Sequence, residues 1–422
     1  MRGESLESRR VEGLRARVVF DSRGDKTVEV EVTVDGHTAR AAAPSGKSRG
    51  KREVKPFADG GAEGSVRALR EASGKIVGAT LDGPLAVDRL LREVDGTEDF
   101  SRIGGNAALA TSAAAAIAYA GSGSEPLYRS LSRYLGSDPG IPLPLSNVLG
   151  GGAHAGSGAP EFQEYLLIPV GARNVMEAID ANVLAYRKLG RLLSQEVKGY
   201  PLGKGDEGGY APPVGNRKAL ELVARAAEEA SDETGVRIAL GLDVAGSNVF
   251  DPKSGRYALR SDGLYLTGEE MVSFLGELVD RFGIVYLEDP FSEDSPELFA
   301  ELQRSVPNTF VCGDDLVVTR PDLIRSAIEA GSIRAAIVKP NQVGLLSLAA
   351  ESARICHDRR ALPVASHRSG ETTDAYLSHF AVGTWCRLIK CGLIGGERMA
   401  KLNELLRIGE EVGSDRLRRL SV

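Results

Sequence analysis

The chain has 422 residues, more than one ordinary hydrophobic core supports, so two domains or a small domain beside a large α/β barrel are expected. Its 52 Lys and Arg residues against 58 Asp and Glu residues give a net charge of -6, which provides no general electrostatic reason to bind nucleic acid or an anionic membrane. Small molecules and metal ions are therefore the expected partners.

The amino-terminal residues 1–17 are rich in charge and lack the apolar centre of a secretory signal. We find no apolar run that is long enough to span a bilayer. These two features predict a cytoplasmic protein with no membrane partner.

The first part of the chain has an α+β pattern. Residues 27–44 alternate between apolar and polar side chains, and Asp35-Gly36 between the two halves is a strong hairpin signal. Helical patterns follow at 84–95 and 108–120. A Gly/Pro-rich stretch at 136–145 then suggests a boundary, so we expect an N-terminal α+β capping domain over 1–136 and a second domain over 137–422.

Helix and strand patterns alternate in the second domain. An amphipathic helix at 217–234 closes at Gly235 and precedes an apolar strand at 236–243. Thr267 and Glu270 form a capping-box signature before the next helix. Further apolar strands are predicted at 284–289, 309–315, 335–340, 362–367 and 388–392. Such repeated units predict a parallel sheet, and their number favours a closed (β/α)8-type barrel over an open sheet.

Ionisable residues lie at or just past the carboxyl end of successive predicted strands. A single Asp in such a place is usually a helix cap, but so many residues at equivalent positions are hard to explain in that way. The carboxyl ends of barrel strands converge on one mouth, where barrel enzymes carry out their chemistry. The residues in question are Asp243, Glu288, Asp314, Lys339, His367 and Lys390.

The types of these residues indicate a reaction class. The carboxylates of Asp243, Glu288 and Asp314 would repel one another unless a hard cation neutralised them, and an all-oxygen ligand set favours Mg²⁺. Near that cation and Lys390, the ammonium form of Lys339 would be disfavoured, so Lys339 could act as a base. Together with anion-binding Lys390 and Arg368, this predicts proton abstraction beside a carboxylate.

A second acidic segment, KGDEGGYAP at 204–212, fits neither helix nor strand periodicity. Gly-rich acidic segments are commonly solvated turns. Beside a Mg²⁺ site and a lysine base, Glu207 can instead supply the acid on the opposite face of the substrate. Its glycines would let the backbone approach the ligand closely.

The chain resembles the enolase (phosphopyruvate hydratase) family over nearly its full length. The similar motifs follow the order of the family, and ten matches in order are highly specific. They are VFDSRG (19–24), PSGKS (44–48), HAG (154–156), QE (163–164), KGDEGG (204–209), LEDPFSED (287–294), GDDL (313–316), VKPNQVG (338–344), SHRSGET (366–372) and AKLNELLRI (400–408). The resemblance implies an enolase-like variant of the barrel and a homodimer or higher homo-oligomer.

The resemblance also implies the reaction: the reversible, Mg²⁺-dependent dehydration of 2-phospho-D-glycerate to phosphoenolpyruvate in glycolysis. Lys339 would take the C2 proton and Glu207 would protonate the departing C3 hydroxyl. Two Mg²⁺ ions would bind in each active site, the second together with substrate. The implied metal ligands are Asp243, Glu288, Asp314 and Ser48, and the implied substrate contacts are His154, Gln163, Glu164, Lys339, Arg368, Ser369 and Lys390, with His154 and Glu164 also in the catalytic group.

The sequence departs from the family pattern in several loops. SRGDKT and SGKSR replace the usual SRGNPT and SGAST, so Lys47 and Arg49 add positive charge to a loop expected to close over the site. Arg387 and Leu388 also depart from the pattern that precedes the last lysine. None of these changes removes a predicted catalytic group or metal ligand.

Two other functions stay open from the sequence. The chain could be a divergent lyase or racemase of the superfamily that acts on another carboxylate substrate, although Arg368 and Lys390 would give excess positive charge for a substrate without a phosphate. It could also be a non-catalytic scaffold with the same fold, in which an intact Glu207 and Lys339 would be hard to explain. An assay for phosphoenolpyruvate formation separates the first alternative from an enolase.

Overall fold

The computed structural model describes residues 7–47, 49–156 and 158–420. Its first domain contains an antiparallel sheet in the order β3-β2-β1-β4. The predicted hairpin is confirmed: the alternating pattern of β2 buries its valines, and Asp35 and Gly36 both have the positive φ that a tight hairpin turn requires. The strands are β1 (Arg9–Phe20), β2 (Lys26–Val34), β3 (His37–Ala42) and β4 (Thr80–Leu81).

Four α-helices accompany this sheet. The alanine-rich α3 packs against β2 and β3, and its small side chains let the helix lie close to the strands. The predicted helices of this domain are confirmed as α2 and α3. The helices are α1 (Gly61–Ala72), α2 (Val87–Asp95), α3 (Gly105–Ser122) and α4 (Leu127–Leu135).

The second domain is a closed eight-stranded barrel, as predicted. Nearly every strand residue in it is buried, because the inner side chains fill the barrel and the outer ones pack under helices. In order around the barrel, the strands are β5 (Leu143–Gly150), β6 (Glu164–Ile168), β7 (Ala239–Asp243), β11 (Ile284–Glu288), β12 (Phe310–Gly313), β13 (Ala335–Val338), β14 (Leu362–Ser366) and β15 (Leu388–Lys390).

The predicted barrel strands β7, β11, β12, β13, β14 and β15 pair in parallel, as expected. The strand β6, which was not predicted, runs antiparallel to both β5 and β7. The connection at 151–163 has only a short 3-10 turn, Gly152–His154, in its described residues, so the chain returns without a crossover helix. The two helices α5 (Val175–Glu196) and α6 (Asn216–Thr234) then both precede β7.

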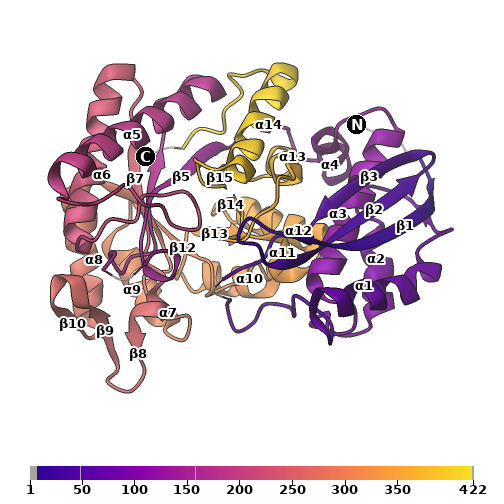
Figure 1. Ribbon diagram of the computed structural model, residues 1–422, viewed down its shortest axis with the longest axis horizontal. Helices are drawn as coiled ribbons and strands as arrows, with labels where there is room; N and C mark the ends of the chain where they lie inside the picture. The colour runs from indigo at the N-terminus through magenta and orange to yellow at the C-terminus, as the bar shows by residue number, and fades with distance from the viewer. Residues whose placement is uncertain (1–6, 48, 157, 421–422) are drawn as a thin grey trace.

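Helices surround the barrel (Figure 1). The predicted end of α6 at Gly235 is confirmed, and Thr267 makes both hydrogen bonds of its capping box with Glu270. A small three-stranded antiparallel sheet of β8 (Phe250–Asp251), β9 (Arg256–Leu259) and β10 (Leu264–Leu266) precedes α8. The remaining helices are α7 (Gly246–Val249), α8 (Gly268–Phe282), α9 (Pro296–Ser305), α10 (Pro321–Glu329), α11 (Pro340–Val343), α12 (Leu346–Asp358), α13 (Tyr376–Gly383) and α14 (Gly396–Val412).

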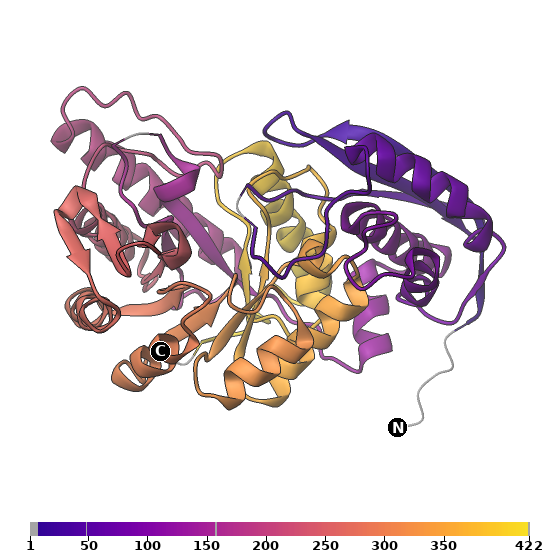
Figure 2. The same cartoon turned by 90° about the horizontal axis from the view of Figure 1, so that it is seen from below.

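The first domain lies beside the C-terminal part of the barrel (Figures 1 and 2), where α3 contacts α11 and α4 contacts α13. Residues 43–47 and 49–57 lie between this domain and the barrel mouth. Among them, Ser45 forms a backbone bridge with Gly370, and Val54 N–H donates to the Gln342 carbonyl at 3.1 Å. The first domain therefore contributes directly to the edge of the mouth, while the boundary at 136/137 stays a prediction.

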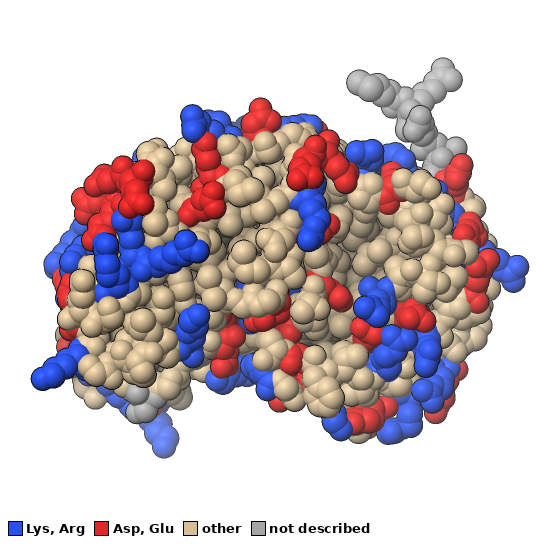
Figure 3. All heavy atoms as spheres, turned by 45° about the horizontal axis from the view of Figure 1, so that its top comes forward, with Lys and Arg blue, Asp and Glu red and all other residues tan. Residues whose placement is uncertain are grey.

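Acidic and basic side chains are interspersed on the face that Figure 3 shows.

Among the described residues, no helix has the length and apolar character needed to cross a membrane.

Candidate active site

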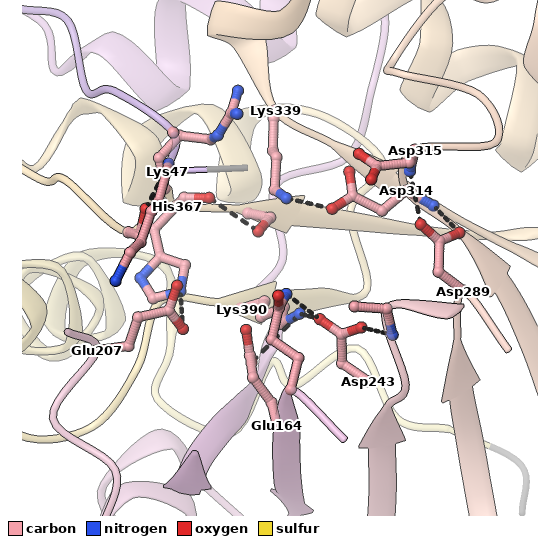
Figure 4. Close-up of a pocket in the computed structure, with 16 residues that line it drawn as sticks. Lys47, Glu164, Glu207, Asp243, Asp289, Asp314, Asp315, Lys339, His367 and Lys390 are labelled. Carbon is pink, nitrogen blue, oxygen red and sulfur yellow. Dashed lines mark hydrogen bonds and ion pairs between the residues drawn. The ribbon is translucent and has the colours of Figure 1, made fainter. Parts of the chain in front are cut away.

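The strand ends bring the predicted residues to one mouth (Figure 4). Asp243 ends β7 and Glu288 ends β11, and the two residues are paired in register. Asp314 and Lys339 directly follow β12 and β13, respectively. His367 likewise follows β14, and Lys390 ends β15. The convergence expected from a barrel is therefore present.

Lys390 lies among buried carboxylates. Its Nζ atom is 2.9 Å from Asp243 Oδ2, 2.8 Å from Glu288 Oε1 and 3.3 Å from Glu164 Oε2. Burial alone would lower the pKa of Lys390, but these three carboxylates outweigh it and raise that pKa well above its usual value. Burial and the nearby Asp243 charge raise the pKa of Glu288 to about 8. If all three carboxylates were ionised, their negative charge would exceed what one ammonium group neutralises.

This charge balance suits a divalent cation. Asp243, Glu288 and Asp314 offer oxygen ligands at or just past the ends of three consecutive barrel strands, and oxygen ligands are those that Mg²⁺ prefers. A bound cation would also offset the repulsion between Asp243 and Glu288, which together with burial raises the pKa of Glu288. The predicted ligand set therefore fits the ion in its chemistry.

A second acidic group lies at the same edge of the mouth. Within the described ranges, the carboxylates of Asp289, Asp314 and Asp315 have oxygens that all lie within 4.8 Å of one another. The Asp289 side chain already accepts the backbone N–H groups of Asp314 and Asp315, at 2.9 and 2.7 Å. Asp289 thus fixes the turn that positions Asp314, and this use of its oxygens favours the predicted ligand set over the second group.

Lys339 contacts the carboxylate of Asp314 through its Nζ atom. Burial alone would lower the pKa of Lys339, but the Asp314 charge more than compensates, and the pKa is raised. The expectation that the ammonium form is disfavoured concerns Lys339 beside a bound cation, so it stays a prediction.

The glycine-rich loop before Pro212 is not a solvated turn at its centre, because Glu207 is only 4% exposed. Gly205 and Gly209 hydrogen bond to each other, and Gly208 has a φ of 81°. A Cβ atom on Gly208 would lie 2.0 Å from the Ile394 carbonyl oxygen, so only glycine fits there. The loop can thus fold tightly enough to bring Glu207 into the mouth.

Asn147 of β5 and His367, just after β14, lie next to the Glu207 carboxylate. Its Oε2 atom accepts a hydrogen bond from Asn147 Nδ2 at 3.3 Å and lies 3.4 Å from His367 Nε2. Burial lowers the pKa of His367 to about 4, and the nearby Arg398 charge also lowers it. His367 is therefore neutral near pH 7 and can donate from only one ring nitrogen.

The other predicted substrate contacts line the same pocket. Gln163 donates from Nε2 to Asp243 Oδ2 at 3.3 Å, and Ser369 accepts the Lys47 backbone N–H at 2.9 Å. Arg368 is buried and donates to Asn341 Oδ1 at 3.0 Å. Ser48 and the side chain of His154 lie outside the described residues, so their predicted roles stay predictions.

Several residues of the site were not predicted from the sequence. Asp289 follows Glu288 and Asp315 follows Asp314, so each acidic dipeptide could have indicated its second residue as part of the site. Asn147 is a polar residue inside the otherwise largely apolar β5, which could have drawn attention. No sequence signal indicates the other missed residues, Glu53, Gln342 and Arg398, which reach the site from the first domain, α11 and α14.

Two protein-family models match separate parts of the chain. "Enolase, N-terminal domain" covers residues 11–131, and "Enolase, C-terminal TIM barrel domain" covers residues 139–418. The chain belongs to the enolase family. The resemblance seen in the sequence motifs is thereby confirmed.

Curated archaeal enolases align with the chain over almost its entire length. Enolase from Methanosphaera stadtmanae is 43% identical over 404 residues, which are 95% of this chain and 97% of the relative. Enolase from Methanothermobacter thermautotrophicus is 42% identical over 409 residues, covering 96% and 98% of the two chains. Enolase from Archaeoglobus fulgidus is 42% identical over 410 residues, covering 96% and 99%. The likeness to enolases thus includes both domains.

Proposed function

We propose that the chain is a glycolytic enolase that catalyses the reversible, Mg²⁺-dependent dehydration of 2-phospho-D-glycerate to phosphoenolpyruvate. The observation that carries this proposal is that Lys339 and Glu207 reach one pocket from different elements and line it together with Lys390 and several carboxylates (Figure 4). This arrangement suits removal of a proton from one carbon and protonation of a hydroxyl on the next. Its location in a chain of the enolase family supports the same reaction.

The proton transfers are assigned to this chain's own side chains. Neutral Lys339 would take the C2 proton, so it must first lose the proton that its contact with Asp314 favours. Glu207 would give its proton to the C3 hydroxyl. The C2–H and C3–O bonds break, a C2–C3 double bond forms, and the hydroxyl leaves as water.

The remaining polar residues would bind and orient the substrate and ions. Asp243, Glu288 and Asp314 would hold the tighter Mg²⁺, and Ser48 would help to hold a second Mg²⁺ when substrate is bound. When bound, the ions would supply positive charge that stabilises the dianion formed by loss of the C2 proton. The substrate's phosphate, carboxylate and hydroxyl would be surrounded by His154, Gln163, Glu164, Arg368, Ser369 and Lys390.

The cationic side chains at the mouth support a phosphorylated substrate. Lys47, Arg368 and Lys390 all line the pocket and offer donors for a phosphate in addition to a carboxylate. An unphosphorylated acid would use fewer of these donors. We therefore favour 2-phosphoglycerate over the substrate of a divergent lyase or racemase.

A direct assay tests the proposal. Purified protein with Mg²⁺ and 2-phosphoglycerate should form the enol product, followed by its ultraviolet absorbance, and chelation of Mg²⁺ should abolish the signal. The same hydroxy acid without its phosphate is the control substrate and should react poorly. No product from 2-phosphoglycerate, with intact folding and added Mg²⁺, would contradict the proposed function and support a scaffold or another substrate.

We also propose, by family resemblance, that the protein is a homodimer or higher homo-oligomer in the cytoplasm. Light scattering on the purified protein tests the first part, and a monomeric mass would contradict it. Cell fractionation tests the second part.

A further inference from the structure

Arg398, in the first turn of α14, is fully buried and joins the two loops that flank the pocket. One terminal nitrogen donates to His367 Nδ1 at 2.8 Å and to the Arg368 carbonyl at 2.7 Å. The other donates to the Asp206 carbonyl at 3.2 Å and to the Ser369 carbonyl at 2.7 Å. A single guanidinium group therefore braces the backbone next to Glu207 and the backbone next to His367.

The contact with Arg398 fixes the tautomer of His367. A guanidinium group has only donors, so His367 Nδ1 must accept with its lone pair. The hydrogen of the neutral ring is then on Nε2, which is the nitrogen that lies 3.4 Å from Glu207 Oε2. The lowered pKa of His367 agrees with a neutral ring beside a buried arginine.

This tautomer has a consequence for Glu207. Its Oε2 atom lies 3.4 Å from His367 Nε2, close to that N–H but not in hydrogen-bond geometry, and accepts from Asn147 Nδ2 at 3.3 Å. An oxygen beside two N–H donors is favoured as the carbonyl oxygen of a protonated carboxyl group, because a carbonyl oxygen has two lone pairs with which to accept, whereas on a hydroxyl the hydrogen takes one of these positions. The transferable proton of Glu207 then belongs on Oε1.

We propose that Arg398 is a positioning residue for the general acid: by fixing the Nε2–H tautomer of His367, it makes Glu207 Oε2 an acceptor and places the proton for the leaving hydroxyl on Oε1. The proposal rests on the proposed role of Glu207. Arg398 acts through His367 and the backbone, so its loss should lower dehydration more than it lowers C2 exchange.

Lys401, on the same helix, provides a matched control. It is also a buried cation, and its Nζ atom donates to Glu371 Oε2 at 2.6 Å, the Thr372 carbonyl at 3.0 Å and the Asp374 carbonyl at 2.9 Å. Lys401 thus braces the segment that follows Ser369 and makes these contacts away from the His367 ring. We expect Lys401→Met to loosen this segment without changing the tautomer of His367.

The first measurement is the ¹⁵N NMR spectrum of ring-labelled histidine in the protein without substrate. The chain has five histidines, and the spectrum of His367→Gln assigns the His367 signals. We expect a single Nε2–H tautomer in the wild type and in Lys401→Met, and loss of that single tautomer in Arg398→Met. A wild-type ring with its hydrogen on Nδ1, or an unchanged tautomer in Arg398→Met, would overturn the proposal whatever the enzyme's reaction.

The second measurement compares two rates with 2-phosphoglycerate. Arg398→Met should lower dehydration by about 10²-fold, a typical loss for a misplaced catalytic group, while exchange of the C2 hydrogen with solvent deuterium persists. Lys401→Met should leave the ratio of the two rates near that of the wild type. Equal losses of both rates in Arg398→Met would overturn the positioning role. Absence of both reactions in the wild type would instead contradict the proposed function.

A second variant covers the case that Arg398→Met does not fold. Arg398→Lys keeps the buried positive charge but has a shorter reach and fewer donors. The proposal requires that it also lowers dehydration more than C2 exchange, by a smaller factor than expected for Arg398→Met. Equal losses of the two rates in a folded Arg398→Lys protein would overturn the proposal.

Discussion

The Glu53 carboxylate of the first domain lies 3.0 Å from the Arg368 guanidinium at the barrel mouth, and both side chains are only 4% exposed. Gln342 extends this contact, because its Nε2 atom lies 3.4 Å from Glu53 Oε1 and 2.9 Å from Asp314 Oδ1. An acid of the first domain thus orients a proposed substrate-binding arginine and is connected to a proposed metal ligand. The first domain is therefore part of the site.

Replacement of Glu53 tests this connection. Glu53→Gln keeps the size of the side chain but removes the charge that balances Arg368, so the free energy of unfolding should fall by about 3 kcal/mol, as for other broken buried ion pairs. Inorganic phosphate should stabilise this variant against thermal unfolding more than it stabilises the wild type, because an anion can replace the lost charge. The measurement is thermal and denaturant unfolding with and without phosphate.

The control is Glu63→Gln, which removes the acid of the exposed Lys26–Glu63 pair in the same domain. Solvent screens an exposed pair, so this variant should unfold almost like the wild type. Equal stability of Glu53→Gln and Glu63→Gln would show that the buried pair has no special role.

The metal ligands can be distinguished by one set of variants. Glu288→Gln and Asp314→Asn each remove a charge from the predicted ligand set and should markedly weaken Mg²⁺ binding in a calorimetric titration. Asp315→Asn removes a charge from the neighbouring acidic group only and should retain most of the affinity. Strong loss in Asp315→Asn with normal binding in Glu288→Gln would instead assign the ion to Asp289, Asp314 and Asp315.

The neutral state of His367 predicts a pH dependence of stability. The native ring stays neutral down to about pH 4, whereas an ordinary histidine in the unfolded chain binds a proton near pH 6.5. The unfolded state therefore takes up more protons in this window, and the free energy of unfolding should fall by about 3 kcal/mol from this group as pH drops from 6.5 to 4.

Comparison with His367→Gln isolates this contribution. The buried acids titrate in both proteins, so the wild type should lose about 3 kcal/mol more than the variant between pH 7 and pH 4. Denaturant unfolding at several pH values measures the difference. Parallel curves for the two proteins would show that His367 is not held neutral in the native state.

Local patterns in the sequence predicted much of the fold. The Asp35-Gly36 turn, the helix end at Gly235 and the capping box at Thr267 all depend on residues close together in the chain, and all are confirmed. The ionisable residues at the strand ends were also predictable, because barrel topology brings equivalent positions together.

Other features depend on contacts that local patterns do not encode. The 12-residue β1 carries four arginines and has a charged pattern, yet it forms a strand by pairing with β2. The reversed direction of β6 depends on a connection that lacks a crossover helix. The Glu53–Arg368 contact joins residues 315 positions apart, and the pairing of Lys339 with Asp314 depends on where two side chains meet in space.

We assign two separate proton transfers to Lys339 and Glu207. The most direct test measures dehydration of 2-phosphoglycerate and exchange of its C2 hydrogen with solvent deuterium in Lys339→Ala and Glu207→Gln, with Mg²⁺ binding checked in both. Lys339→Ala should abolish both reactions. Glu207→Gln should lower dehydration by about 10²–10⁴-fold, the usual effect of losing a general acid, while C2 exchange persists. If Glu207→Gln lost exchange as completely as Lys339→Ala, with metal binding intact, the result would contradict the assignment of two separate proton transfers.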